Sequence, residues 1–204
     1  MNQWSRSVLC LLAVITLTVI AQAQTDVALS LYGAFNSKTS NGFNTQIPAN
    51  AAGGMVELRH LSNPLLGYGV SYSYNRANQN YSIPLLCSRS PISCTIGQSV
   101  SANAHQIAFN WVPSIRLASL RPFGLLGVGV LFEQPAGDQT GTTSATMPVF
   151  DYGAGLDWSL LPHLGLRVQY RGNLYKAPDL STILQSTGSF TQTAEPMIGA
   201  YFRL

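Results

Sequence analysis

Long stretches of strictly alternating apolar and polar residues constrain the fold of this chain more than any other feature of its sequence. Between Leu164 and Arg171, leucine, valine and tyrosine fill every even position, whereas glycine, glutamine and arginine fill every odd one. Successive side chains of a β-strand point to opposite faces, so this stretch predicts a strand with one apolar and one polar face. The same alternation recurs in residues 149–160 and 193–204. The chain is therefore predicted to be all-β.

Eight segments have the composition and spacing of such strands. They lie near residues 27–36, 54–60, 67–75, 101–112, 121–132, 149–160, 164–175 and 193–204. The faces of the fifth segment are ambiguous, because Gly124, Gly127 and Gly129 do not share one face. We provisionally turn its apolar side chains outward, namely Leu126, Val128, Val130 and Phe132.

The connections between these segments alternate in length. Long connections span residues 37–53, 76–100, 133–148 and 176–192, and short ones span 61–66, 113–120 and 161–163. Membrane barrels have long extracellular loops and short periplasmic turns, which produces this alternation, and an even strand count returns both chain ends to one side. The pattern predicts an eight-stranded antiparallel up-and-down transmembrane β-barrel.

The composition agrees with a wall that faces lipid. Charged residues make up only 9% of the chain, against ~25% in ordinary soluble domains. A membrane barrel is apolar outside and has few positions for charge. The only lysines are Lys38 and Lys176 and there is no basic cluster, so a nucleic-acid surface is not indicated.

The first 23 residues have the layout of a secretory signal peptide. Arg6 precedes an apolar run from Val8 to Ile20, and Ala21-Gln22-Ala23 provides small residues for cleavage. The run is shorter than the ~20 residues of a spanning helix. We expect residues 1–23 to be a signal peptide and residues 24–204 to form one barrel domain.

Aromatic residues gather near the ends of the predicted strands. With odd strands running outward, they form one girdle near each rim, as expected at the two membrane interfaces. The alternative is that they form the core of a soluble sandwich. The predicted girdle residues are Phe35, Tyr68, Tyr74, Trp111, Phe132, Phe150, Trp158, Tyr175 and Phe202.

These segments resemble the small outer-membrane β-barrel family, of the OmpA-like or OmpX-like kind. The resemblance covers residues 24–204 and is carried by residues 121–129, 168–178 and the last strand. It implies residence in the Gram-negative outer membrane, contact with outer-membrane lipid and lipopolysaccharide, and handling by periplasmic chaperones and the barrel assembly machinery. It also implies that the machinery reads a C-terminal signal, formed here by Ile198, Ala200, Phe202 and Leu204.

Two cysteines remain after removal of the signal peptide, Cys87 and Cys94, in the second long connection. An oxidising compartment favours a local disulfide between them. A metal site is the alternative, but two cysteines with no nearby histidine or acid fall short of the four ligands of structural zinc. We expect the disulfide, and no metal or cofactor.

Seven charged residues are predicted to point into the barrel: Glu57, Arg59, Asp157, Arg167, Arg171, Glu195 and Arg203. Eight strands enclose an interior just wide enough for side chains to fill, and buried charges must be paired. These residues predict an internal network of ion pairs. The alternative is that they line a gated or narrow polar pore.

Catalysis is the least supported function. The histidines are His60, His105 and His163, and no spacing places a nucleophile or an acid beside any of them. We expect a non-enzymatic protein that serves envelope integrity or surface contact and adhesion through four long extracellular loops. The alternatives are a narrow channel or conduit for small or hydrophobic solutes and, third, a soluble lipocalin-like carrier.

Overall fold

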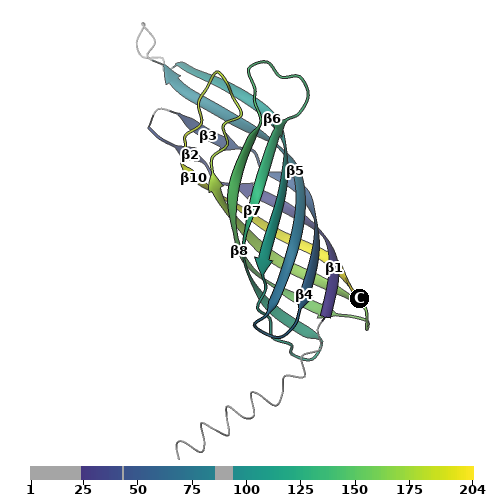
Figure 1. The fold of residues 1–204 in the computed structure, drawn as a ribbon. Helices are drawn as coiled ribbons and strands as arrows, with labels where there is room; N and C mark the ends of the chain where they lie inside the picture. The colour runs from purple at the N-terminus through teal and green to yellow at the C-terminus, as the bar shows by residue number, and fades with distance from the viewer. Residues whose placement is uncertain (1–23, 43, 86–93) are drawn as a thin grey trace, which may run out of the picture.

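The computed structural model describes residues 24–42, 44–85 and 94–204. The predicted signal peptide and Cys87 lie outside these residues. Eight long strands form a tilted cylinder, and the last strand ends beside the start of the first (Figure 1). No helix within the described residues is long and apolar enough to cross a membrane. The long strands are β1 (Gln24–Asn36), β4 (Ala51–Leu61), β5 (Gly67–Leu85), β6 (Cys94–Trp111), β7 (Leu120–Pro135), β8 (Ala145–Ser159), β9 (Leu164–Lys176) and β10 (Phe190–Arg203).

Each long strand pairs antiparallel with its neighbours in the chain, and β1 pairs with β10. The β5–β6 pairing joins the two ends of the order β5-β4-β1-β10-β9-β8-β7-β6, so the sheet closes on itself. Val27 lies opposite Phe202 across the β1–β10 seam. The predicted eight-stranded antiparallel barrel is confirmed.

The wall is apolar outside and polar inside. On β9, Val168 is 55% exposed whereas Arg167 and Arg171 are almost fully buried. The provisional choice for β7 is confirmed, because all four of its apolar residues face outward. Gly127 and Gly129 face the interior, where a Cβ on Gly129 would lie 2.3 Å from the carbonyl oxygen of Ile107. Glycine is needed at these positions because the neighbouring backbone leaves no room for a side chain. Since glycine is neither clearly apolar nor polar, the alternation of β7 is difficult to recognise in the sequence.

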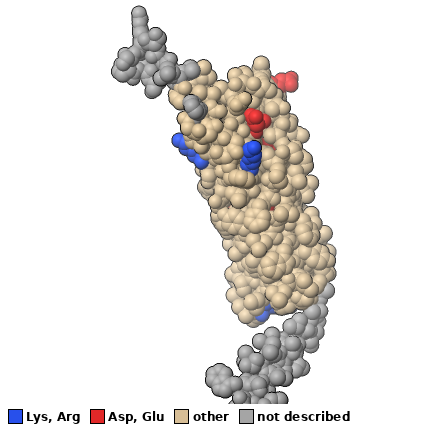
Figure 2. Space-filling view, turned by 60° about the vertical axis from the view of Figure 1, so that its left-hand side comes forward, with Lys and Arg blue, Asp and Glu red and all other residues tan. Residues whose placement is uncertain are grey.

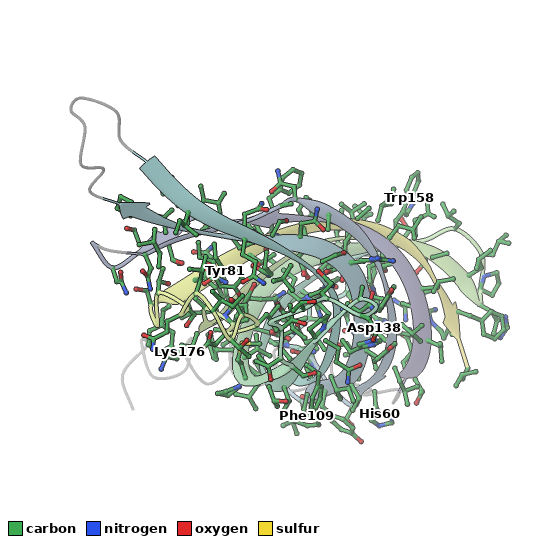
Figure 3. The ribbon with its side chains drawn as sticks, turned by 90° about the horizontal axis from the view of Figure 1, so that it is seen from above. His60, Tyr81, Phe109, Asp138, Trp158 and Lys176 are labelled. Atoms are coloured by element: carbon green, nitrogen blue, oxygen red, sulfur yellow. The ribbon has the colours of Figure 1, made fainter. Side chains whose placement is uncertain are left out.

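Eight of the nine predicted girdle residues are exposed on the outer face, and Figure 3 shows Trp158 at the periphery. Tyr175 is wrong as a girdle residue, since it is only 5% exposed and faces the interior. Its odd number places it on the same face of β9 as Arg167 and Arg171, and Leu174 takes the outward position instead. The residues of the predicted assembly signal face outward on β10 and at its end.

The extracellular end differs most from the sequence-based prediction. The connection predicted over residues 76–100 is largely strand, because β5 continues to Leu85 and β6 begins at Cys94. Two short strands, β2 (Thr39–Ser40) and β3 (Thr45–Pro48), replace part of the predicted 37–53 loop, and β3 pairs with the outer part of β5. These segments rise beyond the lipid-facing wall, so they need no apolar outer face. The alternation that marks the wall strands is therefore weak there.

Arginine at the middle of the outer wall should destabilise the barrel more than arginine near its rim. Val168→Arg places a cation in lipid and should lower the free energy of unfolding by about 2–4 kcal/mol, falling to about 0–1 near an interface. Leu174→Arg is the matched control, because Leu174 has the same outward orientation on the same strand near the outer rim. Equilibrium unfolding in lipid vesicles measures both values. Equal losses would contradict the assigned position of the membrane.

Candidate functional site

The half of the barrel interior nearer the short turns holds a cluster of five buried charged side chains. We call it the ionic cluster, and it consists of Asp26, Glu57, Arg59, Asp157 and Arg167. Arg167 donates hydrogen bonds to Asp157 at 2.7 Å, Glu57 at 2.8 Å and Asp26 at 2.9 Å. Arg59 donates to Glu57 from Nε at 3.0 Å and from Nη2 at 2.9 Å. One guanidinium thus holds three carboxylates, and the second holds one of them from two nitrogens.

Strand register brings these groups together. Asp157 and Arg167 lie directly opposite each other on β8 and β9, and Asp26 lies opposite Arg59 on β1 and β4. Glu57 is two residues before Arg59, so it shares the inward face of β4. The ionic cluster is therefore built by β1, β4, β8 and β9, and it connects parts of the wall that are distant in sequence.

Apolar and aromatic side chains lie beside the ionic cluster. The guanidinium carbon of Arg59 lies 4.0 Å from the centre of the Phe123 ring, which suits a cation–π contact. Phe123 packs with Leu61 and Val112 in a small buried cluster near the periplasmic turns. Charged, aromatic and apolar side chains therefore occupy the interior at this level.

A second ionic group lies further outward in the barrel. Nε of Arg171 donates to Glu195 at 2.7 Å, and its Nη2 donates to Ser73 at 2.9 Å. Asp151 accepts two hydrogen bonds from the Gln106 amide, at 2.9 and 3.0 Å. Each of these buried carboxylates therefore has a donor, which offsets the cost of removing it from water.

Six of the seven predicted interior charges belong to these two groups, and Arg203 does not. Arg203 donates to Ser159 at 3.2 Å and to the carbonyl oxygen of Pro162, and it forms no ion pair within the described residues. It faces inward but lies at the strand end, where the periplasmic turn provides its acceptors. Asp26 was missed because the first strand was predicted to begin at Val27, although Asp26 has the same even parity as the buried Ser30.

The outer mouth of the barrel is covered by residues 177–189, which we call the mouth loop. Leu180 has no exposed surface and packs on Tyr81, whose hydroxyl donates to the carbonyl oxygen of Pro178 at 3.0 Å. The same hydroxyl accepts from the backbone N–H of Leu180 at 3.1 Å. Tyr81 lies in the part of β5 beyond the wall, where burial raises the pKa of its phenol and keeps it a donor. The long connection predicted over residues 176–192 is a loop at residues 177–189, and its apolar side chains pack into the barrel mouth.

A cavity of about 30 Å³ remains between the mouth loop and the ionic groups. Polar side chains surround it, among them Gln79, Glu133 and Asn173, and both Glu133 and Asn173 are buried. Such a volume holds about two water molecules. The interior at this level therefore leaves a small, mainly polar cavity with room for water.

The three histidines weighed as candidate catalytic residues lie on the outer surface of the barrel. His60 bonds to the Thr25 hydroxyl at 2.9 Å, His163 stacks on Phe202, and His60 appears at the periphery in Figure 3. Within the described residues, no three histidine, cysteine, aspartate or glutamate side chains are arranged to hold a metal ion. The disulfide from Cys87 to Cys94 stays a prediction, because Cys87 lies outside these residues.

Comparison with known proteins identifies the family. Residues 7–192 match the outer membrane protein beta-barrel domain family, and the chain belongs to it. Membership implies the Gram-negative outer membrane. No curated protein sequence matches the chain at a significant level.

Solved structures share the fold at low sequence identity. Neisserial surface protein A has a TM-score of 0.59 and 12% identity, over 88% of this chain and 97% of that one. Ail, the attachment invasion locus protein of Yersinia pestis, has a TM-score of 0.51 and 16% identity, over 89% and 99%. OprG of Pseudomonas aeruginosa has a TM-score of 0.50 and 11% identity, over 89% and 96%.

Removal of the central guanidinium should destabilise the barrel strongly. Arg167→Met leaves three buried carboxylates without their shared partner, which should cost about 3–5 kcal/mol of unfolding free energy. Arg203→Met is the control, because a partly exposed arginine of this kind contributes less than about 1 kcal/mol. Equilibrium unfolding in detergent or lipid measures both. If the two variants lost the same free energy, the ionic cluster would not be a stabilising centre.

Proposed function

We propose that this outer-membrane barrel is a non-enzymatic surface protein that makes contact with material outside the cell. The observation that carries the proposal is the filled interior, in which the ionic cluster occupies the lower half and the mouth loop covers the outer end. A barrel filled in this way acts as an anchor, and its function then lies in the parts outside the membrane.

The extracellular segments support each other in a way that suits a contact surface. The outer parts of β5 and β6 form a hairpin that rises beyond the wall and leans away from the barrel axis in Figure 1. The connection between β7 and β8 is joined to the mouth loop by two backbone hydrogen bonds, from Thr143 to Leu180 and from Thr182 to Gly141. A surface that is ordered before contact loses less conformational entropy on binding.

One of the similar barrels has a name that refers to attachment. Ail is named for attachment and invasion, and its structure includes the heparin analogue sucrose octasulfate. The low identity means that the likeness concerns the fold alone. We nevertheless choose sulfated polysaccharide as one probe of attachment for this chain, because that structure includes a sulfated ligand. Bare glass and cultured cells are the other two probes.

The contact proposal predicts that attachment depends on the β5–β6 hairpin. Residues 80–99 can be replaced with an Asn-Gly turn, because Gln79 and Val100 lie opposite each other in the register. Cells that display this variant should attach no better than cells without the protein. Tyr81→Phe is the control, since it weakens the mouth loop but keeps the hairpin. Full attachment by the shortened variant, with normal surface display, would contradict the proposal.

A narrow conduit is the second candidate, and the small polar cavity beneath the mouth loop favours it. Solute would have to displace the ionic cluster, whose five members are each at most 1% exposed. A lipocalin-like carrier is less well supported, because its apolar residues would line the interior and here they cover the outside.

The two candidate functions, anchor and conduit, predict different ionic currents across a membrane. We expect the refolded native barrel to give no discrete current steps in a planar lipid bilayer, because paired side chains fill its interior. A general porin reconstituted in the same way serves as the positive control. Reproducible steps from the native chain that change in Arg167→Met would support the conduit and contradict a closed interior.

A further inference from the structure

A group of outward-facing polar and aromatic side chains crosses β5 and β6 at the outer end of the wall. We call it the outer-rim patch, and it consists of Tyr72, Tyr74 and Arg76 on β5 and Asn103 and His105 on β6. Tyr74 lies directly opposite His105, and Arg76 lies opposite Asn103. The outward residues that follow on β6 toward the periplasm are Ile107, Phe109 and Trp111, which are all exposed and apolar or aromatic. The patch therefore marks the point where the outer face changes from apolar to polar.

Contacts within the patch hold the imidazole and the guanidinium. Nδ1 of His105 shares a hydrogen bond of 2.8 Å with the Tyr72 hydroxyl, and the ring centre of Tyr74 lies 5.0 Å from that of His105. The Tyr74 hydroxyl donates to Oδ1 of Asn103 at 3.1 Å. Nε of Arg76 donates to the Ser101 hydroxyl at 3.3 Å. Within the described residues, Nε2 of His105 and the two terminal nitrogens of Arg76 have no hydrogen-bond partner.

The patch lies at the level where lipid phosphates are expected. His105 is opposite both Tyr74 and Phe132, two residues of the outer aromatic girdle. Girdle aromatics mark the level of the headgroups. Arg76 is two residues further out on β5, which is about 7 Å along the strand. Its guanidinium is therefore placed just above the apolar zone.

Charge around the patch favours an anion. Within the described residues, every aspartate and glutamate on a barrel strand is buried in the interior, and no carboxylate forms an ion pair with Arg76. The exposed Asp138 belongs to the connection between β7 and β8, next to Gln139, whose side chain bonds to the backbone of Ser101. Figure 2 shows one face of the barrel as a wide tan zone almost without charge, with coloured groups near its ends. An arginine without a carboxylate partner that faces the headgroups is suited to bind phosphate through its two terminal nitrogens.

The surface next to the patch has room for an acyl chain. Gly54 on β4 lies opposite Tyr74 and opposite Leu31 of β1, and it faces outward. A Cβ on Gly54 would meet no atom closer than 3.9 Å. The wall is therefore shallow between the Tyr74 ring and the Leu31 side chain. A free anion would gain nothing from this apolar strip, whereas a lipid would cover it.

We propose that the outer-rim patch binds the phosphate group of an outer-leaflet glycolipid, with Arg76 and His105 as the ligands of the phosphate and one acyl chain over Gly54. Tyr72 is a positioning residue, because it fixes the imidazole through Nδ1 and leaves Nε2 toward the lipid. The proposal depends on the location in the outer membrane and not on the surface-contact role.

The test compares phosphorylated lipid A with lipid A whose phosphates have been removed enzymatically. Each lipid is titrated into the purified, detergent-solubilised full barrel, and the bound fraction is measured by native mass spectrometry. The native chain should prefer the phosphorylated lipid by about tenfold, as expected for charge-assisted hydrogen bonds to one anion. Arg76→Gln and His105→Gln should each lose most of this preference, and Tyr72→Phe should lose part of it.

Lys176→Gln is the matched control, because Lys176 is also an exposed cation at the outer end of a barrel strand and lies outside the patch. This variant should keep the preference. Slower migration after heating, compared with the unheated sample, verifies that each variant is folded. Equal binding of the two lipids by the native chain, an equal loss in Lys176→Gln, or displacement of the lipid by millimolar inorganic phosphate would overturn the proposal.

Discussion

Closure of the backbone hydrogen bonds is the constraint on which the rest of this structure depends. Hydrocarbon offers no partner to an unpaired N–H or C=O group, so a sheet can cross a membrane only as a ring without edges. The β1–β10 and β5–β6 pairings complete that ring. Once it is closed, every wall residue faces either lipid or the interior. The alternation of apolar and polar residues is a direct consequence.

Closure also explains why the charges lie inside. A wall with few polar positions outside must place its acids and arginines in a narrow interior, where each needs a partner. Arg167 meets this need by contacting three carboxylates from three strands, β1, β4 and β8. The same contacts that make the interior stable also fill it. One set of ion pairs therefore both stabilises the interior and occupies it at this level.

The sequence predicts most of the wall and little of what lies beyond it. Alternation is strong where lipid demands it, so strands such as 164–175 and their interior residues can be predicted directly. Tyr175 was misplaced because its position near a strand end was weighed above its parity with Arg171. The outer parts of β5 and β6 were predicted as loop, because segments outside the lipid need no apolar face and show no clear alternation. Residues 177–189 were predicted as a loop and are one, but their packing into the barrel mouth was not predicted. The patch around His105 depends on cross-strand register, which no single segment reveals.

The outer hairpin of β5 and β6 can tolerate insertions and deletions during evolution that the wall cannot. Within the part of the chain that the structure describes, β6 beyond the wall pairs with β5 alone, and β5 there pairs with β6 and the short β3. These pairings set no register in the closed ring below. Loss or gain of two opposed residues near the tip shortens or lengthens the hairpin and leaves the wall unaltered. A single residue inserted within the wall instead turns every following side chain of that strand to the other face. Variation can therefore accumulate quickly in the exposed hairpin while the wall below it is held almost constant.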